Sequence, residues 1–151
     1  MRKAGANHNG NQLERFIEDR LIEKGYTFVQ RERFRAACYL DQPFYSRQFF
    51  VGKSIYDTDS YCDFILFHPI KWPDSLIIES KWQQSVGSVD EKYVYTVTNI
   101  KERYPFKTIL LLDGGGYKSK AEKWIRDQVD QQLIHVFNMA EFQKWANKEG
   151  I

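Results

Sequence analysis

The sequence contains little of the residue types that define several protein classes. Its 151 residues include two cysteines, four prolines and three histidines. The two cysteines, Cys38 and Cys62, are too few for a cysteine zinc cluster or a disulfide framework. A single disulfide stays open, although two free buried thiols in a reducing cytoplasm are favoured. His8, His68 and His135 lack metal-ligand spacing, which favours structural or exposed roles.

Long apolar runs and a strong net charge are also missing. No apolar segment approaches the length of a membrane span, and the N-terminal MRKAGANHNGNQ lacks the apolar region of a signal peptide. We therefore expect a cytoplasmic protein without a membrane partner. Twenty-two basic and 20 acidic residues leave a net charge of +2, so any basic patch must be local. With 42% hydrophobic residues, the chain predicts one domain over 1–151, in which residues 1–9 form a flexible tail.

Helical and strand-like patterns alternate along the chain. An apolar stripe at helical spacing predicts a first helix, with Asn9 or Asn11 as its cap and Gly25 as its stop; the stripe consists of Leu13, Phe16, Ile17, Leu21 and Ile22. Further elements are a long strand or hairpin with an irregular connection over 26–56, strands over 61–69, 75–83, 106–116 and 133–138, and helices from Ser88, over 118–131 and over 139–148. The order α-β-β-β-α-β-α-β-α predicts one α/β domain with a mixed sheet.

Two charged residues interrupt an apolar strand in the stretch LIIESKWQ. Side chains of a strand alternate between its two faces. Glu79, Lys81 and Gln83 therefore share one face. Ser80 and Trp82 point to the other face, where they pack.

The preceding strand, YCDFILFHP, carries a second embedded acid, Asp63. Carboxylates are costly to bury as bare charges, and a divalent cation between Asp63 and Glu79 would remove that cost. Mg²⁺ prefers oxygen ligands and is often held by one or two carboxylates with phosphate and water. Lys81 beside such an ion could orient a water or stabilise charge on a phosphate. These residues indicate phosphodiester hydrolysis.

The acid-x-Lys spacing alone is weak evidence. This composition produces it about twice by chance, and it occurs twice, at Glu79-Ser-Lys81 and at Asp90-Glu-Lys92. The second copy falls at a predicted helix start, where a solvated charged face is the favoured interpretation. For Glu79 and Lys81, a cross-strand or edge ion pair is the alternative to a catalytic site.

The pattern resembles the PD-(D/E)XK nuclease superfamily over roughly residues 10–113. That superfamily has an α-β-β-β-α-β core, with a metal-binding Asp in the second core strand and E-x-K in the third, which match Asp63 and Glu79-Ser-Lys81. One departure is Cys62, which stands where the motif has proline. The resemblance implies a restriction-endonuclease-like α/β fold with a mixed central sheet flanked by helices, followed by a C-terminal α-β-α extension.

The resemblance also implies a set of site residues. Asp63, Glu79 and the backbone carbonyl of Ser80 would bind Mg²⁺, for which Mn²⁺ can substitute, and Lys81 would position or activate the attacking water. Glu14 on the first helix would reach the metal, directly or through water; the alternative is an ordinary exposed helix acid. Gln83 would orient Lys81 or contact a phosphate; the alternative is a polar residue where the strand leaves the core.

DNA contacts are predicted in the segment 31–50, which mixes arginines with aromatic residues. Arginines bind phosphates and guanine edges, and aromatic rings stack on exposed bases. The alternative is that the aromatic residues build the core and the arginines line its exposed edge. The predicted contacts are Arg31, Arg33, Arg35 and Arg47, with Ser88 at a helix start and Lys118 after the glycine turn at 114–116.

These observations predict a Mg²⁺-dependent DNA endonuclease that acts in restriction or a related DNA-processing role. Because one core holds one site and cuts one strand, we expect a homodimer or a second subunit. Two alternatives stay open: the catalytic subunit of a heteromeric nuclease that is inactive alone, and a non-catalytic nucleic-acid-binding protein on the nuclease fold.

Overall fold

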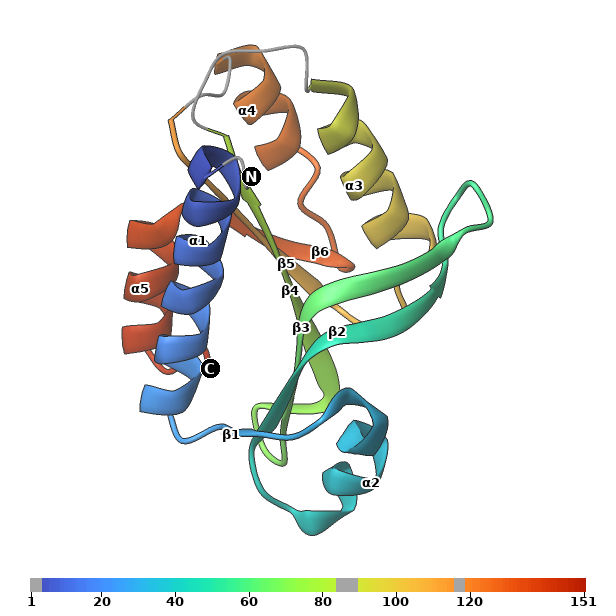
Figure 1. Cartoon of the computed structure of the whole chain (residues 1–151), viewed down its shortest axis with the longest axis vertical. Coiled ribbons are helices and arrows are strands. Elements are labelled where there is room, and N and C mark those ends of the chain that lie inside the picture. The colour runs from blue at the N-terminus through green and yellow to red at the C-terminus, as the bar shows by residue number, and fades with distance from the viewer. Residues whose placement is uncertain (1–3, 84–89, 116–118) are drawn as a thin grey trace.

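The computed structural model describes residues 4–83, 90–115 and 119–151. Its centre is a mixed sheet of six strands in the order β1-β2-β3-β4-β5-β6 (Figure 1). β2, β3 and β4 are antiparallel neighbours, whereas β1 is parallel to β2, and β5 and β6 continue the sheet parallel to β4. The strands are β1 (Thr27–Phe28), β2 (Phe44–Lys53), β3 (Asp59–His68), β4 (Trp72–Trp82), β5 (Thr108–Asp113) and β6 (Leu133–Phe137).

Helices cover both faces of this sheet (Figure 1). α1 (Ala4–Glu23) and α5 (Met139–Asn147) lie side by side on one face, and α3 (Asp90–Glu102) and α4 (Ser119–Arg126) lie on the other. The short helix α2 (Phe34–Ala37) and its two flanking 3₁₀ turns precede β2. α3 and α4 make the crossovers that parallel strands require. This architecture confirms the predicted α/β class with a restriction-endonuclease-like mixed sheet.

The core follows the two-sided burial of β5. Ile109 and Leu111 pack in the cluster under α1 and α5, and Leu110 and Leu112 pack in the cluster under α3 and α4. A strand buried on both faces needs apolar residues at successive positions, as the run in 106–116 predicts. A third cluster, beneath α2, joins β2 and β3 and includes Cys62, which is fully buried.

The first helix is longer than the sequence pattern predicts. It begins at Ala4, so most of the expected tail 1–9 is helical, and Asn9 and Asn11 lie inside the helix rather than at its cap. Adding residues to a formed helix costs far less than nucleating it, so the helix extends through residues 4–10 although glycine and asparagine are weak helix formers. The predicted stripe is also too wide, because Ile22 is 56% exposed while Leu21 is fully buried.

The interpretation of residues 26–56 as a long strand or hairpin is only partly right. The chain pairs over two residues in β1 and then coils through 3₁₀ turns at Arg31–Arg33 and Cys38–Leu40, on either side of α2. Phe34 and Ala37, three residues apart, are both buried, so a helical turn hides them where an extended strand would split them between two faces.

Several smaller expectations can be compared with the structure directly. Gly25, Gly114 and Gly115 adopt positive φ, which confirms a stop after α1 and a sharp turn after β5. Cys38 and Cys62 are free thiols. In the three described ranges, no helix is both long and apolar enough to cross a membrane.

Candidate active site

β3 and β4 stop pairing where the candidate acids begin. The last pair of their ladder at this end is Phe64 with Ile78, which is followed by Asp63 and Glu79. Beyond this pair, the Ser80 N–H donates to Asp63 Oδ2 at 2.8 Å, and the Ser80 hydroxyl donates to the same oxygen at 3.2 Å. A side-chain carboxylate therefore replaces the backbone acceptor that β3 would otherwise supply, and the two strands diverge around the acids.

Glu79 is a buried carboxyl whose partners come from two other elements. Its side chain is 4% exposed, and its Oε1 accepts a hydrogen bond from the Tyr104 hydroxyl at 2.7 Å. Burial and the negative charge of Asp63, to which it is also hydrogen-bonded, raise the pKa of Glu79 well above its ordinary value. The positive charge of Lys81 and the bond from Tyr104 act in the opposite direction.

The alternation of β4 places Lys81 with Glu79. Ile78 and Trp82 pack in the cluster beneath α1 and α5, whereas Ile77 packs in the cluster beneath α2. Because alternate residues of a strand lie on one face, Glu79 and Lys81 lie on the same face of β4 as Ile77. Lys81 is near enough to lower the pKa of Glu79. One face of β4 therefore carries an acid and a base, and the other face anchors the strand in the core.

A cavity of about 530 Å³ opens beside Lys81 and lies between the end of β4 and the first turns of α3. The Tyr93 hydroxyl donates to Gln83 Oε1 in its wall. Lys92, which the sequence pattern assigned to a solvated helix face, lines this cavity with Lys81. The lining residues are Lys81, Trp82, Gln83, Lys92, Tyr93, Tyr95 and Thr96.

The backbone at Gly114 fixes the end of β4 against β5. The Gln83 N–H donates to the Asp113 carbonyl at 2.9 Å. Gly114 has φ +108°, and a Cβ at this position would collide with the Gln83 backbone. Glycine is therefore required both for its conformation and for the close approach of the two chains.

Glu14 approaches the acids from α1 but is held by Arg47. Arg47 Nη2 lies 2.7 Å from Glu14 Oε2, and Arg47 Nη1 lies 3.9 Å from Glu18 Oε1. Burial and the nearby charge of Asp63 raise the pKa of Glu14, and Arg47 opposes this shift. Glu14 is thus neither an ordinary exposed helix acid nor a member of the Asp63–Glu79 pair, and its role as a metal ligand stays a prediction.

The donor set of Asp63 and Glu79 fits a hard divalent cation. Two carboxyl groups close enough to share a hydrogen bond repel each other when both are ionised, and a cation between them would remove that repulsion. Across the described part of the chain, no group of three or more His, Cys, Asp or Glu residues could hold a metal ion. A cation here would therefore depend on this pair together with backbone, water or phosphate oxygens, which is how Mg²⁺ is often bound.

A comparison with known families agrees with this geometry. A family model described as the PD-(D/E)XK nuclease superfamily domain matches residues 5–150. The chain belongs to this superfamily. Membership indicates a nuclease, and hence a hydrolase. No curated protein and no solved structure gave a significant match.

The departure of this nuclease from its family motif, Cys62 in place of proline, has a packing explanation. Cys62 is fully buried in the cluster beneath α2, where it packs as a small apolar side chain. Burial raises the pKa of its thiol, so the group stays neutral beside Asp63 and Glu79.

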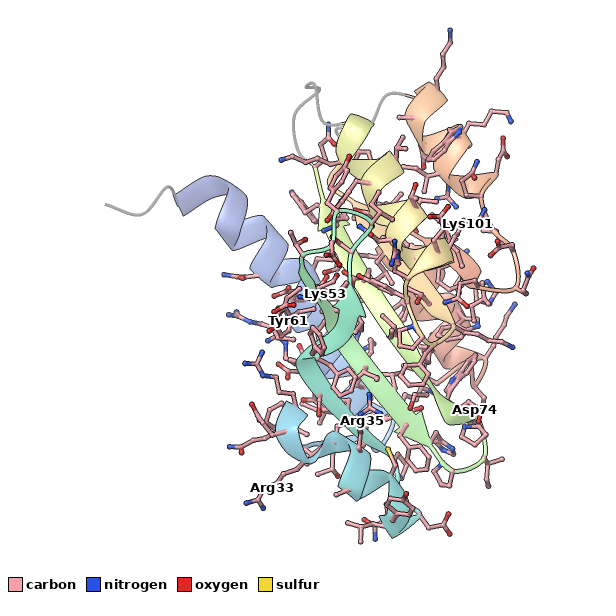
Figure 2. All side chains as sticks on the ribbon, turned by 90° about the vertical axis from the view of Figure 1, so that its right-hand side faces the viewer. Arg33, Arg35, Lys53, Tyr61, Asp74 and Lys101 are labelled. Atoms are coloured by element: carbon pink, nitrogen blue, oxygen red, sulfur yellow. The ribbon has the colours of Figure 1, made fainter. Side chains whose placement is uncertain are left out.

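The arginines predicted to contact DNA occupy different environments. Arg33 projects away from the protein body (Figure 2), and Arg35 lies over the Phe49 ring at 5.7 Å. Arg31 donates to the Gln48 carbonyl at 2.9 Å. Arg47 is turned toward α1 and pairs with acids there. Ser88 and Lys118 lie outside the described residues.

Sequence reasoning missed three residues that complete the site: Tyr104, Lys92 and Gln48. Tyr104 lies 25 positions after Glu79, and Gln48 Nε2 lies 3.5 Å from Asp63 Oδ1 across β2 and β3. Neither contact has a local sequence signature, because each depends on tertiary packing. For Lys92, the second acid-x-Lys copy was a signal, but its helical position favoured a solvated face.

Proposed function

We propose that this nuclease is a Mg²⁺-dependent endonuclease that hydrolyses phosphodiester bonds in DNA. The observation that carries the proposal is the hydrogen-bonded Asp63–Glu79 pair at the divergence of β3 and β4, with Lys81 on the same strand. The cavity beside Lys81 supports access of a substrate to this lysine. In that cavity Lys92 and two tyrosines add cationic and aromatic groups, which suit a nucleic-acid strand.

Each residue has a role that follows from its chemistry. Asp63, Glu79 and the Ser80 carbonyl would hold Mg²⁺, and Glu14 is proposed as a more distant acid that acts through water. When bound, Mg²⁺ supplies Lewis-acid stabilisation of phosphate charge and a more acidic bound water.

Lys81 would hold the attacking water or stabilise negative charge that develops on the phosphate. Gln83, whose amide oxygen accepts a hydrogen bond from the Tyr93 hydroxyl, would orient Lys81 or contact a neighbouring phosphate.

The proposal includes an assembly. A single site of this kind cuts one strand, so cleavage of both strands requires a homodimer or a second subunit. The purified chain alone is then expected to nick supercoiled plasmid, and to linearise it only at concentrations at which two copies meet. Sedimentation across the same concentrations measures the assembly independently.

Plasmid cleavage with Mg²⁺ or Mn²⁺ tests the proposal. We expect Lys81→Ala and Glu79→Gln each to reduce the cleavage rate by about 100-fold or more, because charge-stabilising and proton-transferring groups contribute on this scale. Lys81→Ala should leave DNA affinity nearly intact. Lys123→Ala, which removes a 76%-exposed lysine on α4, serves as the matched control and should cleave normally.

Two outcomes would contradict this assignment. If both active-site variants cleave at the native rate, the site is wrong. If calorimetry detects no uptake of Mg²⁺ or Mn²⁺ with or without DNA, the protein binds nucleic acid without catalysis. Cleavage that appears only after a second protein is added would identify the chain as the catalytic subunit of a heteromeric nuclease.

A further inference from the structure

Two aromatic rings lie open to solvent on the hairpin formed by β2 and β3. Phe50 and Tyr61 are partners in the strand register, with ring centroids 5.5 Å apart. Each residue is 46% exposed. Large aromatic side chains usually dominate the buried area of a core or an interface, so an exposed pair marks a surface that a partner can cover.

Arginines surround this aromatic pair. The Arg31 guanidinium lies over the Tyr61 ring at 5.5 Å from its centroid, and the Arg35 guanidinium lies over Phe49. Figure 2 shows Arg33, Arg35, Lys53 and Tyr61 along the same side of the molecule. A cavity of about 280 Å³, which we call the stacking pocket, is lined by Arg31, Glu32, Arg35, Phe49, Phe50 and Tyr61.

The stacking pocket is connected to the candidate active site through Gln48. Its side-chain Nε2 lies 3.5 Å from Asp63 Oδ1, and its backbone carbonyl accepts the hydrogen bond from Arg31. Tyr61 precedes Asp63 by two residues on β3, a spacing of about 6.6 Å along an extended strand. A strand of nucleic acid at Asp63 could therefore place a neighbouring nucleotide at Tyr61.

We propose that the stacking pocket binds one unpaired base, so that the preferred substrate is duplex DNA with a single-stranded segment beside the cleaved bond. The inference rests on the proposed function, since it assigns the substrate class of the same site. Aromatic rings stack on bases of any sequence, and arginine adds cation–π contact and phosphate attraction. The stacking pocket is smaller than the cavities that usually enclose drug-sized ligands, so its size suits a single ring system.

The charge and position of the pocket argue for nucleic acid over other occupants. Its lining holds two arginines against one acid, Glu32, which pairs with Arg31 at 3.2 Å. A cross-strand aromatic pair can also simply stabilise a hairpin. That role alone does not explain why the Arg31 guanidinium lies over Tyr61 of the pair and the Arg35 guanidinium over the neighbouring Phe49 ring.

Binding measured without divalent metal tests the proposal, because cleavage is then absent. The probes are a fluorescent blunt duplex, the same duplex with a short single-stranded extension, and the extended duplex with abasic nucleotides in the extension. We expect the extension to tighten binding about tenfold, the scale that stacking of one base provides. Abasic nucleotides keep the phosphates and should abolish most of this gain.

Variants of the pocket sharpen the comparison. Tyr61→Leu keeps an apolar residue on the hairpin and should lose the preference for the extension, whereas Tyr61→Phe should retain it. Tyr39→Leu removes an 88%-exposed tyrosine outside the pocket and is the matched control. If Tyr61→Leu does not fold, the abasic probe on the native protein still decides the question.

Three results would overturn the proposal. They are equal affinity of the native protein for blunt and extended duplexes, no effect of abasic nucleotides, and a change of oligomeric state in Tyr61→Leu, which would make the pocket an interface between copies. The proposed function fails separately. Cleavage of blunt and extended DNA without preference rejects only the stacking pocket, whereas stacking-dependent binding without any metal-dependent cleavage rejects only the nuclease assignment.

Discussion

The Tyr104 hydroxyl donates a hydrogen bond to Glu79 Oε1 at 2.7 Å. Tyr104 follows α3, whereas Glu79 lies on β4, so the bond joins the helical layer to the candidate metal ligand. Groups that hydrogen-bond a metal ligand orient it and tune its affinity for the metal. Tyr104 is therefore a positioning residue of the candidate site.

Replacing Tyr104 with phenylalanine should weaken metal binding. The hydroxyl lowers the pKa of Glu79, so its loss lets a proton compete more strongly with the cation. We expect Mn²⁺ affinity at neutral pH to fall about 10- to 100-fold, the usual scale for such partners. Calorimetric titration at two pH values checks this, because the deficit should shrink at alkaline pH. A uniform deficit at both values would indicate altered geometry instead of proton competition.

Glu79 should make the metal-free protein less stable as the pH rises. Its folded pKa lies above the ordinary 4.5, so both states are protonated in acid and the full stability is present there. Above about pH 4.5 the unfolded chain releases its proton first, and the free energy of unfolding falls until the folded pKa is passed. Glu79→Gln should flatten this decline, and Mg²⁺ should stabilise the native protein more at pH ~8 than at pH ~5.

Urea unfolding at several pH values measures this dependence. Glu149→Gln is a suitable control. The hydrogen bond from Lys71 lowers the pKa of this exposed acid, so this substitution should change the pH dependence of stability only below about pH 4.5. A decline of the same slope in native protein and Glu79→Gln would assign the pH dependence to another group.

Lys92 should contribute to substrate binding without being required for folding. It is exposed at the mouth of the cavity that also contains Lys81. Lys92→Ala is expected to raise KM for DNA several-fold and to reduce the salt dependence of binding by about one counterion, because one phosphate contact is removed. Lys123→Ala, outside the cavity, should change neither quantity. An unchanged salt slope in Lys92→Ala would place the DNA elsewhere.

Arg33 and Arg47 should separate DNA binding from folding. Arg33 is exposed, so Arg33→Ala should weaken DNA binding at all sequences and leave stability within about 0.5 kcal/mol. Arg47 pairs with Glu14 and lies 5.0 Å from the centroid of the Phe64 ring. Arg47→Ala should therefore lower the melting temperature, as paired thermal unfolding and anisotropy measurements would show. The reverse pattern would mean that Arg47 turns outward to bind DNA.

The elements that the sequence predicts well are those whose burial is decided locally. The apolar run around Leu110 predicts a strand covered on both faces, and the charges in LIIESKWQ predict one polar face because alternation in a strand is fixed. The helical stripe of Leu13, Ile17 and Leu21 similarly predicts the face of α1 that packs on the sheet.

The elements that the sequence predicts poorly depend on contacts between distant segments. Residues 26–56 are predicted as a long strand or hairpin, but burial of Phe34 and Ala37 on one side favours helical turns. The pairing of Arg47 with Glu14 joins residues 33 positions apart, and no local pattern distinguishes Arg47 from the exposed Arg33. Periodicity identifies which residues are buried, whereas the partners of buried polar groups are set by tertiary packing.

Because the Ser80 N–H donates a hydrogen bond to Asp63, this acid has a structural role that is independent of catalysis. An inactive descendant that lost the carboxylate at position 63 would leave this partly buried donor without its acceptor, or would have to extend the pairing of β3 and β4 and close the site. Decay of catalytic activity and remodelling of the sheet are therefore coupled at this position. Asparagine, which keeps an acceptor oxygen, is the substitution through which such a descendant could lose cleavage first and keep its fold.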